Sequence, residues 1–185
     1  MRRALAAVAI LAALGIALTP AACIKSMNSE ELKASMEIQD VETKWVSKYY
    51  QPWPPRLILV PVLTFKVKNV SDKPLTYINF NAIYQAVGDK DNLGDSFRAA
   101  IRGTPVQPGE TSEAISLQSN YGVDGKNLAQ FKANPAWKTY RVRLFAQSKG
   151  SSFVLLGEWD VSKTIDFKEP EPVGIGEQPG QAVKK

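Results

Sequence analysis

The sequence predicts an all-β protein, a sandwich of about seven strands with one or two short helical turns. Three observations predict it. Apolar and polar residues alternate with a period of two through the middle of the chain, which is typical of strands that bury one face. Clusters of Asn, Asp, Gly and Pro separate these stretches and provide turns. The 185 residues are 44% hydrophobic and 22% charged, a balance that fits one folded domain.

The alternating stretches follow one another in order along the chain. Leu63, Phe65 and Val67 alternate with polar neighbours, and the segment 69–74 then predicts a turn. The same alternation returns in the segments 78–84, 115–117, 140–146 and 153–161. Between them, the segments 88–94, 108–110 and 148–151 are rich in turn residues and predict loops.

Two short segments have a helical alternative. Residues 95–102 fit one or two helical turns capped by Asp95, with Phe97 and Ile101 four residues apart, and they fit a strand equally well. Residues 125–132 are expected to hold another helical turn. Both segments are too short to define the fold.

A resemblance narrows the fold class further. Residues 67–75, the aromatic stretch after them and the segment 108–111 resemble small bacterial immunoglobulin-like domains of the FxLYD type. In that family a strand ends in an Asn-x-Ser-Asp-Lys-Pro turn, which is the sequence at 69–74. This chain has Ile-Tyr-Gln at 83–85 where the family tends to have Leu-Tyr-Asp. The resemblance implies an immunoglobulin-like β-sandwich, and a non-catalytic module associated with the cell envelope.

The composition excludes the commonest catalytic and metal chemistry. The chain has no His and one Cys, which removes the Ser-His-Asp triad, the Cys-His pair and the usual zinc sites. Asp89, Asp91 and Asp95 alternate as in a calcium loop, but Leu93 and Ala100 stand where that loop needs oxygen ligands. The sequence therefore predicts a protein that is not an enzyme, with no metal site, no catalytic residue and no cofactor.

The first residues have the pattern of a secretory signal peptide. Arg2 and Arg3 precede an uninterrupted apolar run over 4–18, which is shorter than the roughly 20 residues of a membrane-spanning helix. A break and small residues follow at 19–22, just before the single cysteine. The leader predicts export from the cytoplasm.

The end of the leader resembles the lipobox of bacterial lipoproteins. Ala21-Ala22-Cys23 matches its last three positions, and Pro20 stands where the family usually has Leu. The resemblance implies that the thiol of Cys23 is acylated and that Cys23 becomes the mature N-terminus. Ile24, in place of the Asp that favours inner-membrane retention, implies the outer membrane. The alternative is an ordinary leader, cleaved near residue 21 or 22, that leaves an incidental thiol.

The chain is expected to divide into four parts. These are a signal peptide over 1–22, a tether over 23–33, a β-sandwich over 34–168 and a disordered tail over 169–185, which is rich in Pro, Gly, Glu and Lys. Cleavage removes Arg2 and Arg3 and so lowers the formal net charge from +5 to +3. A charge this mild, without a basic run, argues against a nucleic-acid partner.

The segment 45–56 is the candidate contact surface. It contains two Trp, two Tyr and three Pro, and its prolines predict a sheet edge or an extended loop. Tyr49, Tyr50, Trp53 and Arg56 are the predicted partner-binding residues, because aromatic and Arg side chains dominate many protein interfaces. The alternative is that Trp53 and Tyr50 cover one open end of the sandwich.

The sequence therefore predicts a lipid-anchored protein that faces the periplasm, on the outer membrane rather than the inner one. It would bind an envelope protein as a non-catalytic accessory module, with the membrane as its second partner through Cys23. The alternative function is a carrier or sensor of a small apolar or saccharide ligand.

Arg141 and Arg143 share one strand face, which is typical of the solvated side of a sheet.

Overall fold

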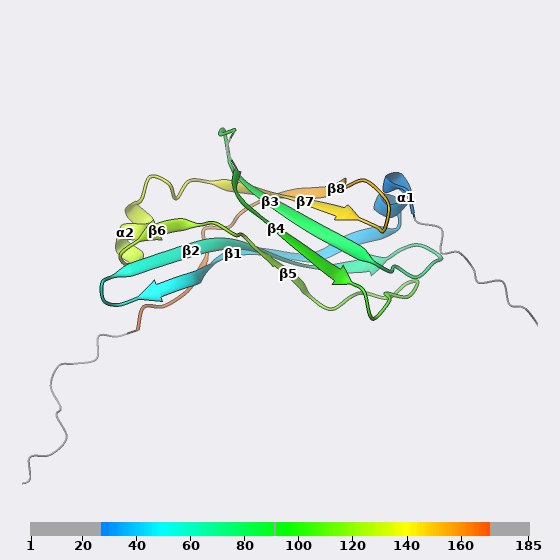
Figure 1. The fold of residues 1–185 in the computed structure, drawn as a ribbon, viewed down its shortest axis with the longest axis horizontal. Helices are drawn as coiled ribbons and strands as arrows, with labels where there is room; N and C mark the ends of the chain where they lie inside the picture. The colour runs from blue at the N-terminus through cyan, green and yellow to red at the C-terminus, as the bar shows by residue number, and fades with distance from the viewer. Residues whose placement is uncertain (1–26, 91, 171–185) are drawn as a thin grey trace, which may run out of the picture.

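The computed structural model describes residues 27–90 and 92–170, which form two β-sheets packed face to face (Figure 1). The first sheet contains β1 (Met36–Gln51), β2 (Arg56–Asn69), β5 (Ile115–Gln118), β6 (Val123–Gly125) and β9 (Ile165–Asp166). The second contains β3 (Ile78–Ala86), β4 (Asn92–Ile101), β7 (Tyr140–Gln147) and β8 (Val154–Asp160). The predicted all-β sandwich is confirmed, and two of these nine described strands are only two or three residues long.

The strand order is that of an immunoglobulin-like sandwich. The first sheet runs β5-β2-β1-β9, and β6 pairs with β2 beyond the end of β5. The second sheet runs β4-β3-β7-β8. Strands β1, β2 and β5 thus occupy positions A, B and E of that fold, while β4, β3, β7 and β8 occupy C′, C, F and G. All of these pairings are antiparallel except the short β9, which lies parallel to β1.

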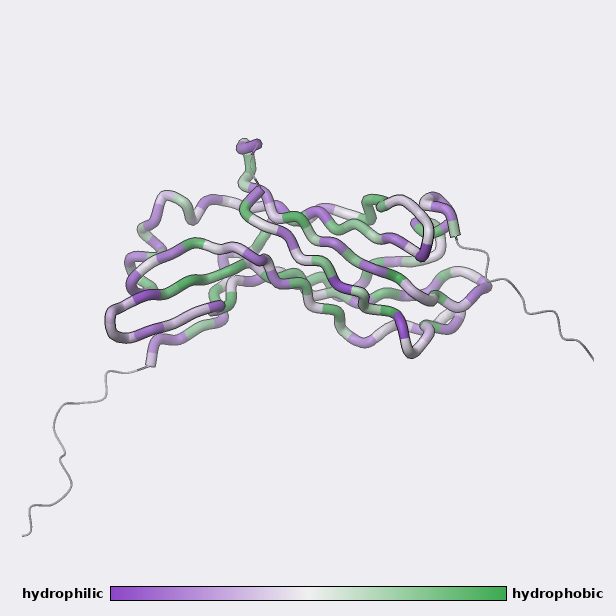
Figure 2. Tube along the Cα trace, in the orientation of Figure 1, coloured by the Kyte–Doolittle hydropathy of each residue, from purple (hydrophilic) through white to green (hydrophobic). Residues whose placement is uncertain are grey.

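The core lies between the two sheets and follows the predicted alternation (Figure 2). Leu63, Phe65 and Val67 of β2 are fully buried, and the ring of Phe65 meets that of Phe80 edge-on at 5.2 Å. The hydroxyl of buried Tyr84 donates a hydrogen bond to the carbonyl of Leu117 at 2.6 Å, and so links the second sheet to the first. Desolvation raises the pKa of that hydroxyl, so it remains a donor at any physiological pH.

Helix α1 (Ser29–Ala34) corrects the expectation of a tether over 23–33. Asn28 and Glu31 form a capping box at its start, and Leu32 is completely buried. The helix packs against β7 and β8, so residues 29–33 belong to the folded domain. The expected tether is mostly polar, and Leu32 is its one buried apolar residue in the described part, so the sequence shows little helical periodicity there. Helix α2 (Leu128–Ala133), capped by Asn127, confirms the helical turn expected over 125–132.

Three other expectations are settled by the strands. Residues 95–102 take the strand alternative, since β4 continues to Ile101. The loop expected over 88–94 is shorter, because β4 begins at Asn92. The predicted sheet edge in the segment 45–56 is confirmed in part: β9 pairs only with Trp45 and Val46, and no described strand pairs with residues 47–51 on that side of β1. The three prolines lie after the end of β1, in the turn over 52–55.

The leader, Cys23 and most of the expected tail lie outside the described residues. Within 27–90 and 92–170, no helix has the length and apolar character needed to cross a bilayer. The described chain starts beside α1 at one end of the molecule's long axis. The β1–β2 hairpin and the end of the described chain, in orange, lie at the opposite end (Figure 1).

Candidate functional site

The predicted contact segment forms the tip of the β1–β2 hairpin. Gln51 pairs with Arg56, and the Pro52-Trp53-Pro54-Pro55 turn between them closes the hairpin. Prolines suit this turn because they have no N–H to leave unpaired. The Trp53–Pro54 peptide bond is cis. We refer to residues 49–56 as the hairpin tip.

Polar and cationic contacts hold the side chains of the hairpin tip. The guanidinium of Arg56 lies over the ring of Tyr49 at 5.8 Å and pairs with Asp124 of β6 at 3.2 Å. The hydroxyl of Tyr49 donates to the side-chain oxygen of Gln51, whose amide nitrogen donates to the carbonyl of Trp53 at 2.8 Å. The turn is thus tied to the strand that precedes it, which restricts the backbone that carries Trp53.

The aromatic residues of the segment separate into buried and displayed groups. Trp45 is buried in the core, where its ring meets Phe131 and Tyr140 edge-on at 5.7 and 5.6 Å. Tyr50 packs against Phe167 at 5.3 Å and belongs partly to the core. Trp53, by contrast, is 85% exposed and Tyr49 is 42% exposed.

The alternative reading, that Trp53 and Tyr50 cover an open end of the sandwich, therefore fits Tyr50 and is wrong for Trp53. Of the four predicted partner-binding residues, Tyr49, Trp53 and Arg56 present surface at the tip, and Tyr50 supports them from below. Next to the tip, the amine of Lys48 donates to the carbonyl of Asn120.

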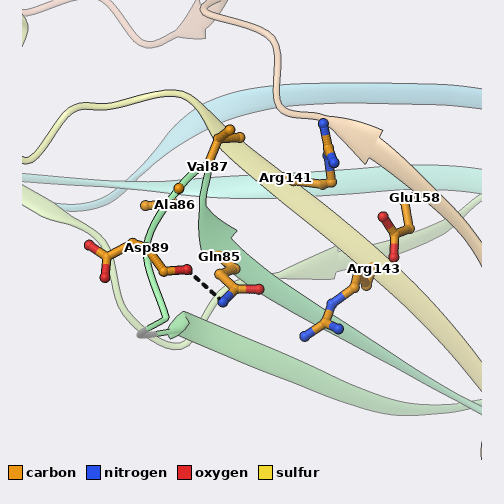
Figure 3. Close-up of a pocket in the computed structure, with 8 residues that line it drawn as sticks. Gln85, Ala86, Val87, Asp89, Arg141, Arg143 and Glu158 are labelled. Atoms are coloured by element: carbon orange, nitrogen blue, oxygen red, sulfur yellow. Dashed lines mark hydrogen bonds between the residues drawn. The ribbon is translucent and has the colours of Figure 1, made fainter.

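A depression of about 200 Å³ lies on the outer face of the second sheet (Figure 3). Its charged members are Asp89, Arg141, Arg143 and Glu158. The two arginine side chains point in opposite directions in Figure 3, and Arg141 pairs with Asp160 at 2.9 Å. The Nε of Arg143 is buried without a hydrogen-bond partner, and its guanidinium lies 6.0 Å from the ring centre of Phe145. Asp89 pairs with Lys138 at 3.4 Å rather than with either arginine.

A second, larger groove of about 470 Å³ is lined by the end of β4, by much of the segment that follows it and by the start of β5. Ile101, Val106 and Ile115 contribute apolar surface to it. Arg98 also lines this groove and donates to the carbonyl of Ser116 at 3.3 Å, which ties the two sheet edges together. A charged side chain on an edge strand protects it from pairing with another chain. Neither depression is an enclosed cavity inside the sandwich, which the predicted carrier would need.

The acidic loop gives no cluster that suits a cation. Asp89 approaches Lys138 at 3.4 Å, and Asp95 accepts a hydrogen bond from Asn120 at 3.2 Å. Asp91 lies outside the described residues. In the part of the chain that the structure describes, no group of three or more Cys, Asp or Glu side chains is placed to hold a metal ion.

Sequence reasoning missed an apolar surface on the outer face of the second sheet. Phe97, Phe145 and Leu155 lie in one cross-strand row, joined through Asn81 of β3. The ring of Phe153 meets that of Phe97 edge-on at 6.5 Å, and the two are 43% and 56% exposed. We call this row, together with its neighbour on β3, the outer apolar patch; its members are Ile83, Phe97, Phe145, Phe153 and Leu155.

A signal for this patch is present in the sequence. Ile83 and Phe145 occupy positions that the alternation assigns to the solvated face, beside Asn79, Asn81 and Arg143. An apolar residue at such a position on two adjacent strands is unexpected unless that face is covered. Neither residue packs against the core.

Comparisons with known proteins leave the family open. No protein-family model matches the chain, and no curated protein matches it. Among solved structures, a target of the Northeast Structural Genomics Consortium is 8% identical with a TM-score of 0.42, over 80% of this chain and 96% of that one. A protein described as ApaA from Bordetella pertussis is 13% identical with a TM-score of 0.36, over 69% of this chain and 93% of that one.

A third solved structure, a β-glucuronidase from glycoside hydrolase family 2, is 8% identical with a TM-score of 0.38. The match covers 65% of this chain and only 11% of that enzyme. At TM-scores this low, none of these likenesses carries an argument about function.

Proposed function

We propose that this chain is an acylated lipoprotein of the bacterial cell envelope, anchored through Cys23, whose β-sandwich is a non-catalytic binding module of an envelope assembly. It faces the periplasm, from the outer membrane rather than the inner one. The observation that carries the binding role is the hairpin tip, where Trp53 is 85% exposed on a turn that is held by hydrogen bonds. The anchor is supported by the apolar leader and by Ala21-Ala22-Cys23.

The positions of the two ends support this division of roles. The described chain begins beside α1, and the 16 residues of β1 lead from there to the hairpin tip. At about 3.3 Å per strand residue, the tip lies roughly 50 Å from the anchored end. An anchor at one end therefore leaves the tip free to reach a partner.

The chemistry of the tip fits a protein partner. Trp, Tyr and Arg are the side chains most enriched among residues that dominate binding energy. Arg56 is paired with Asp124, so the tip presents aromatic surface with little net charge. A partner with an apolar pocket for an indole would fit it.

Separate experiments test the two parts of this proposal, the anchor and the contact surface. Intact-mass analysis of the protein purified from its own cells is expected to show a diacylated N-terminus at Cys23, and an unmodified thiol would contradict the anchor. Photo-crosslinking in cells from position 53 is expected to capture one defined envelope protein. Trp53→Ala is expected to abolish its copurification with the full chain, with Tyr121→Ala, another exposed aromatic at 69%, as the matched control.

The alternative of a small-ligand carrier has a separate readout. A carried apolar or saccharide ligand would add mass to the folded protein in native mass spectrometry. The described core is filled by Trp45, Phe65, Phe80 and Tyr84, which gives the proposal of a protein-binding module the better support.

A further inference from the structure

The outer face of the second sheet is divided into two unlike halves. The half nearer α1 carries Phe97, Phe145, Phe153 and Leu155 of the outer apolar patch. The other half carries the charged residues Arg141, Arg143, Glu158 and Asp160. A monomeric soluble protein seldom leaves contiguous aromatic surface on a sheet face, so the apolar half calls for a covering.

One polar group at the centre of the outer apolar patch is already shielded from water. Asn81 lies between Phe97 and Phe145 in the cross-strand row, and its side-chain oxygen is buried without a hydrogen-bond partner. An amide oxygen that is already dehydrated loses no further hydration when the surface is covered. Covering the patch is therefore favoured by its apolar area and opposed by little polar desolvation at its centre.

The path of the N-terminal chain identifies what covers the patch. Leu32 and the capping box fix α1 against β7 and β8, and the hydroxyl of Ser148 donates to the carbonyl of Met27 at 2.9 Å. Cys23 lies four positions before Met27, and four residues span at most about 14 Å. The acylated thiol would thus be held close to the β7–β8 hairpin, which carries Phe153.

Because this tether is short, even a weak affinity of the patch for lipid would be enough to hold it on the bilayer. A site tied to its target by a short linker faces that target at an effective concentration in the millimolar range. Phe97 and Phe153 are the kind of side chain that inserts at the boundary between headgroups and acyl chains. Lys149, exposed on the same hairpin, can reach lipid phosphates.

The end of the sandwich at α1 is a poorer surface for contact with a bilayer than the apolar half of the outer face of the second sheet. Glu30 and Glu31 lie exposed in the first turn of α1, at the extreme N-terminal end of the sandwich. Carboxylates there would be repelled by anionic lipids. The apolar half of the outer face begins immediately beside that end and carries aromatic rings instead.

We propose that the outer apolar patch is a lipid-docking surface, so that the anchored sandwich lies with the second sheet against the bilayer. This inference rests on the proposed function, because it takes Cys23 as the attachment point. The long axis would then run along the membrane, and the hairpin tip would reach a partner sideways rather than away from the surface.

The experiment supplies the anchor chemically, so that it does not depend on acylation in cells. Cys23 is the chain's only Cys, so protein beginning at Cys23 can be coupled to a maleimide lipid in a supported bilayer of phosphatidylcholine and phosphatidylglycerol. Neutron reflectometry then measures the thickness of the protein layer. Two sheets about 10 Å apart with their side chains give a layer of roughly 25 Å when flat, against roughly 50 Å when the molecule stands on its end.

We expect the thin layer for the native sequence and a thicker layer for the double variant Phe97→Asp/Phe153→Asp. Phe97 is 56% and Phe153 43% exposed, and unchanged urea unfolding of the variant confirms its fold. Trp53→Asp, an equal change at the hairpin tip, is expected to leave the layer thin. A thick native layer, or a thin layer that the double variant does not alter, would overturn the docking surface whatever the intact mass of the natural protein shows.

A second copy of this chain is the other candidate that could cover the outer apolar patch. Light scattering of the uncoupled protein is expected to give a monomer at the concentration used for coupling. A dimer that Phe97→Asp/Phe153→Asp dissociates would assign the patch to self-association and overturn the proposal.

Discussion

The hairpin tip and the outer apolar patch both display aromatic side chains, but they are built differently. The tip comes from eight consecutive residues, and Trp53 stands on a turn with most of its surface in solvent. The patch is assembled from β3, β4, β7, β8 and the residue that precedes β8, and its Phe97 and Phe153 rings meet edge-on. A contact on a turn is specified locally, whereas a contact on a sheet face depends on the whole fold.

The largest expected effect separates two tryptophans of one segment. Trp45→Ala removes a buried ring that meets Phe131 and Tyr140, and should lower the free energy of unfolding by about 3–5 kcal/mol. Trp53→Ala, eight residues later in the displayed part, should change it by less than about 0.5 kcal/mol. Urea unfolding of both variants measures the difference. Similar losses in the two would show that the tip is part of the folding core.

A second substitution tests whether α1 positions the patch. Leu32→Ala leaves a cavity beneath the helix and should lower the free energy of unfolding by about 2–4 kcal/mol. With α1 loosened, the tether from Cys23 lengthens, and we expect the lipid-coupled protein to give a thicker and more diffuse layer. The matched control is Leu128→Ala on α2, a partly buried Leu at the far end, which should leave the layer thin.

The sequence predicted the tip better than the patch, for a physical reason. Proline and aromatic residues within a dozen positions are visible without knowing the fold. The patch requires the register that sets Phe97 opposite Asn81 and Asn81 opposite Phe145. That register joins strands far apart in the sequence, and no local pattern gives it.

The same distinction explains which parts of the fold were predicted. Alternation identified the buried faces of β2, β3 and β7, because one face of each of these strands is apolar. It did not separate strand from helix over 95–102, where Phe97 and Ile101 fit both periods and sheet pairing decides. It missed α1, whose position depends on a single buried Leu32 and a capping box.

A smaller effect concerns the ion pair that holds Arg56 at the tip. Arg56 and Asp124 are 3.2 Å apart and both are more than half exposed. Exposed pairs couple by about 0.2–1 kcal/mol, so a double-mutant cycle with Arg56→Ala and Asp124→Ala should give a value in that range for unfolding. Partner binding should fall more for Arg56→Ala than for Asp124→Ala, because only Arg56 stacks on Tyr49. If the two variants lose partner binding equally, the contact of Arg56 with Tyr49 adds nothing to binding, and Arg56 acts only through its charge.

The smallest expected effect is a pH dependence behind the tip. Lys44 of β1 and Asp166 of β9 are 2.8 Å apart; their hydrogen bond and attraction raise the pKa of Lys44 above 10.5 and lower that of Asp166 below 3.8. A lowered carboxylate pKa stabilises the fold above pH 3.8, and this contribution is lost as the pH falls through the folded-state value. The raised lysine pKa contributes below pH 10.5 and is lost as the pH rises through its own folded-state value.

The pair therefore holds β9 on β1 between about pH 4 and 10.5, and with it Phe167, the residue that supports Tyr50. The protection factors of the β9 amides against hydrogen exchange, which compare each rate with the intrinsic rate at the same pH, should fall below pH 4 in the native protein. In Asp166→Asn these protection factors should be low at pH 6 already and change less on acidification. The protection factors of β3 and β7 amides beneath the outer apolar patch should not respond, because the pair touches neither strand. If they fall together with those of β9, the two ends of the sandwich are coupled, and an acid-induced loss of tip binding would no longer report on the tip alone.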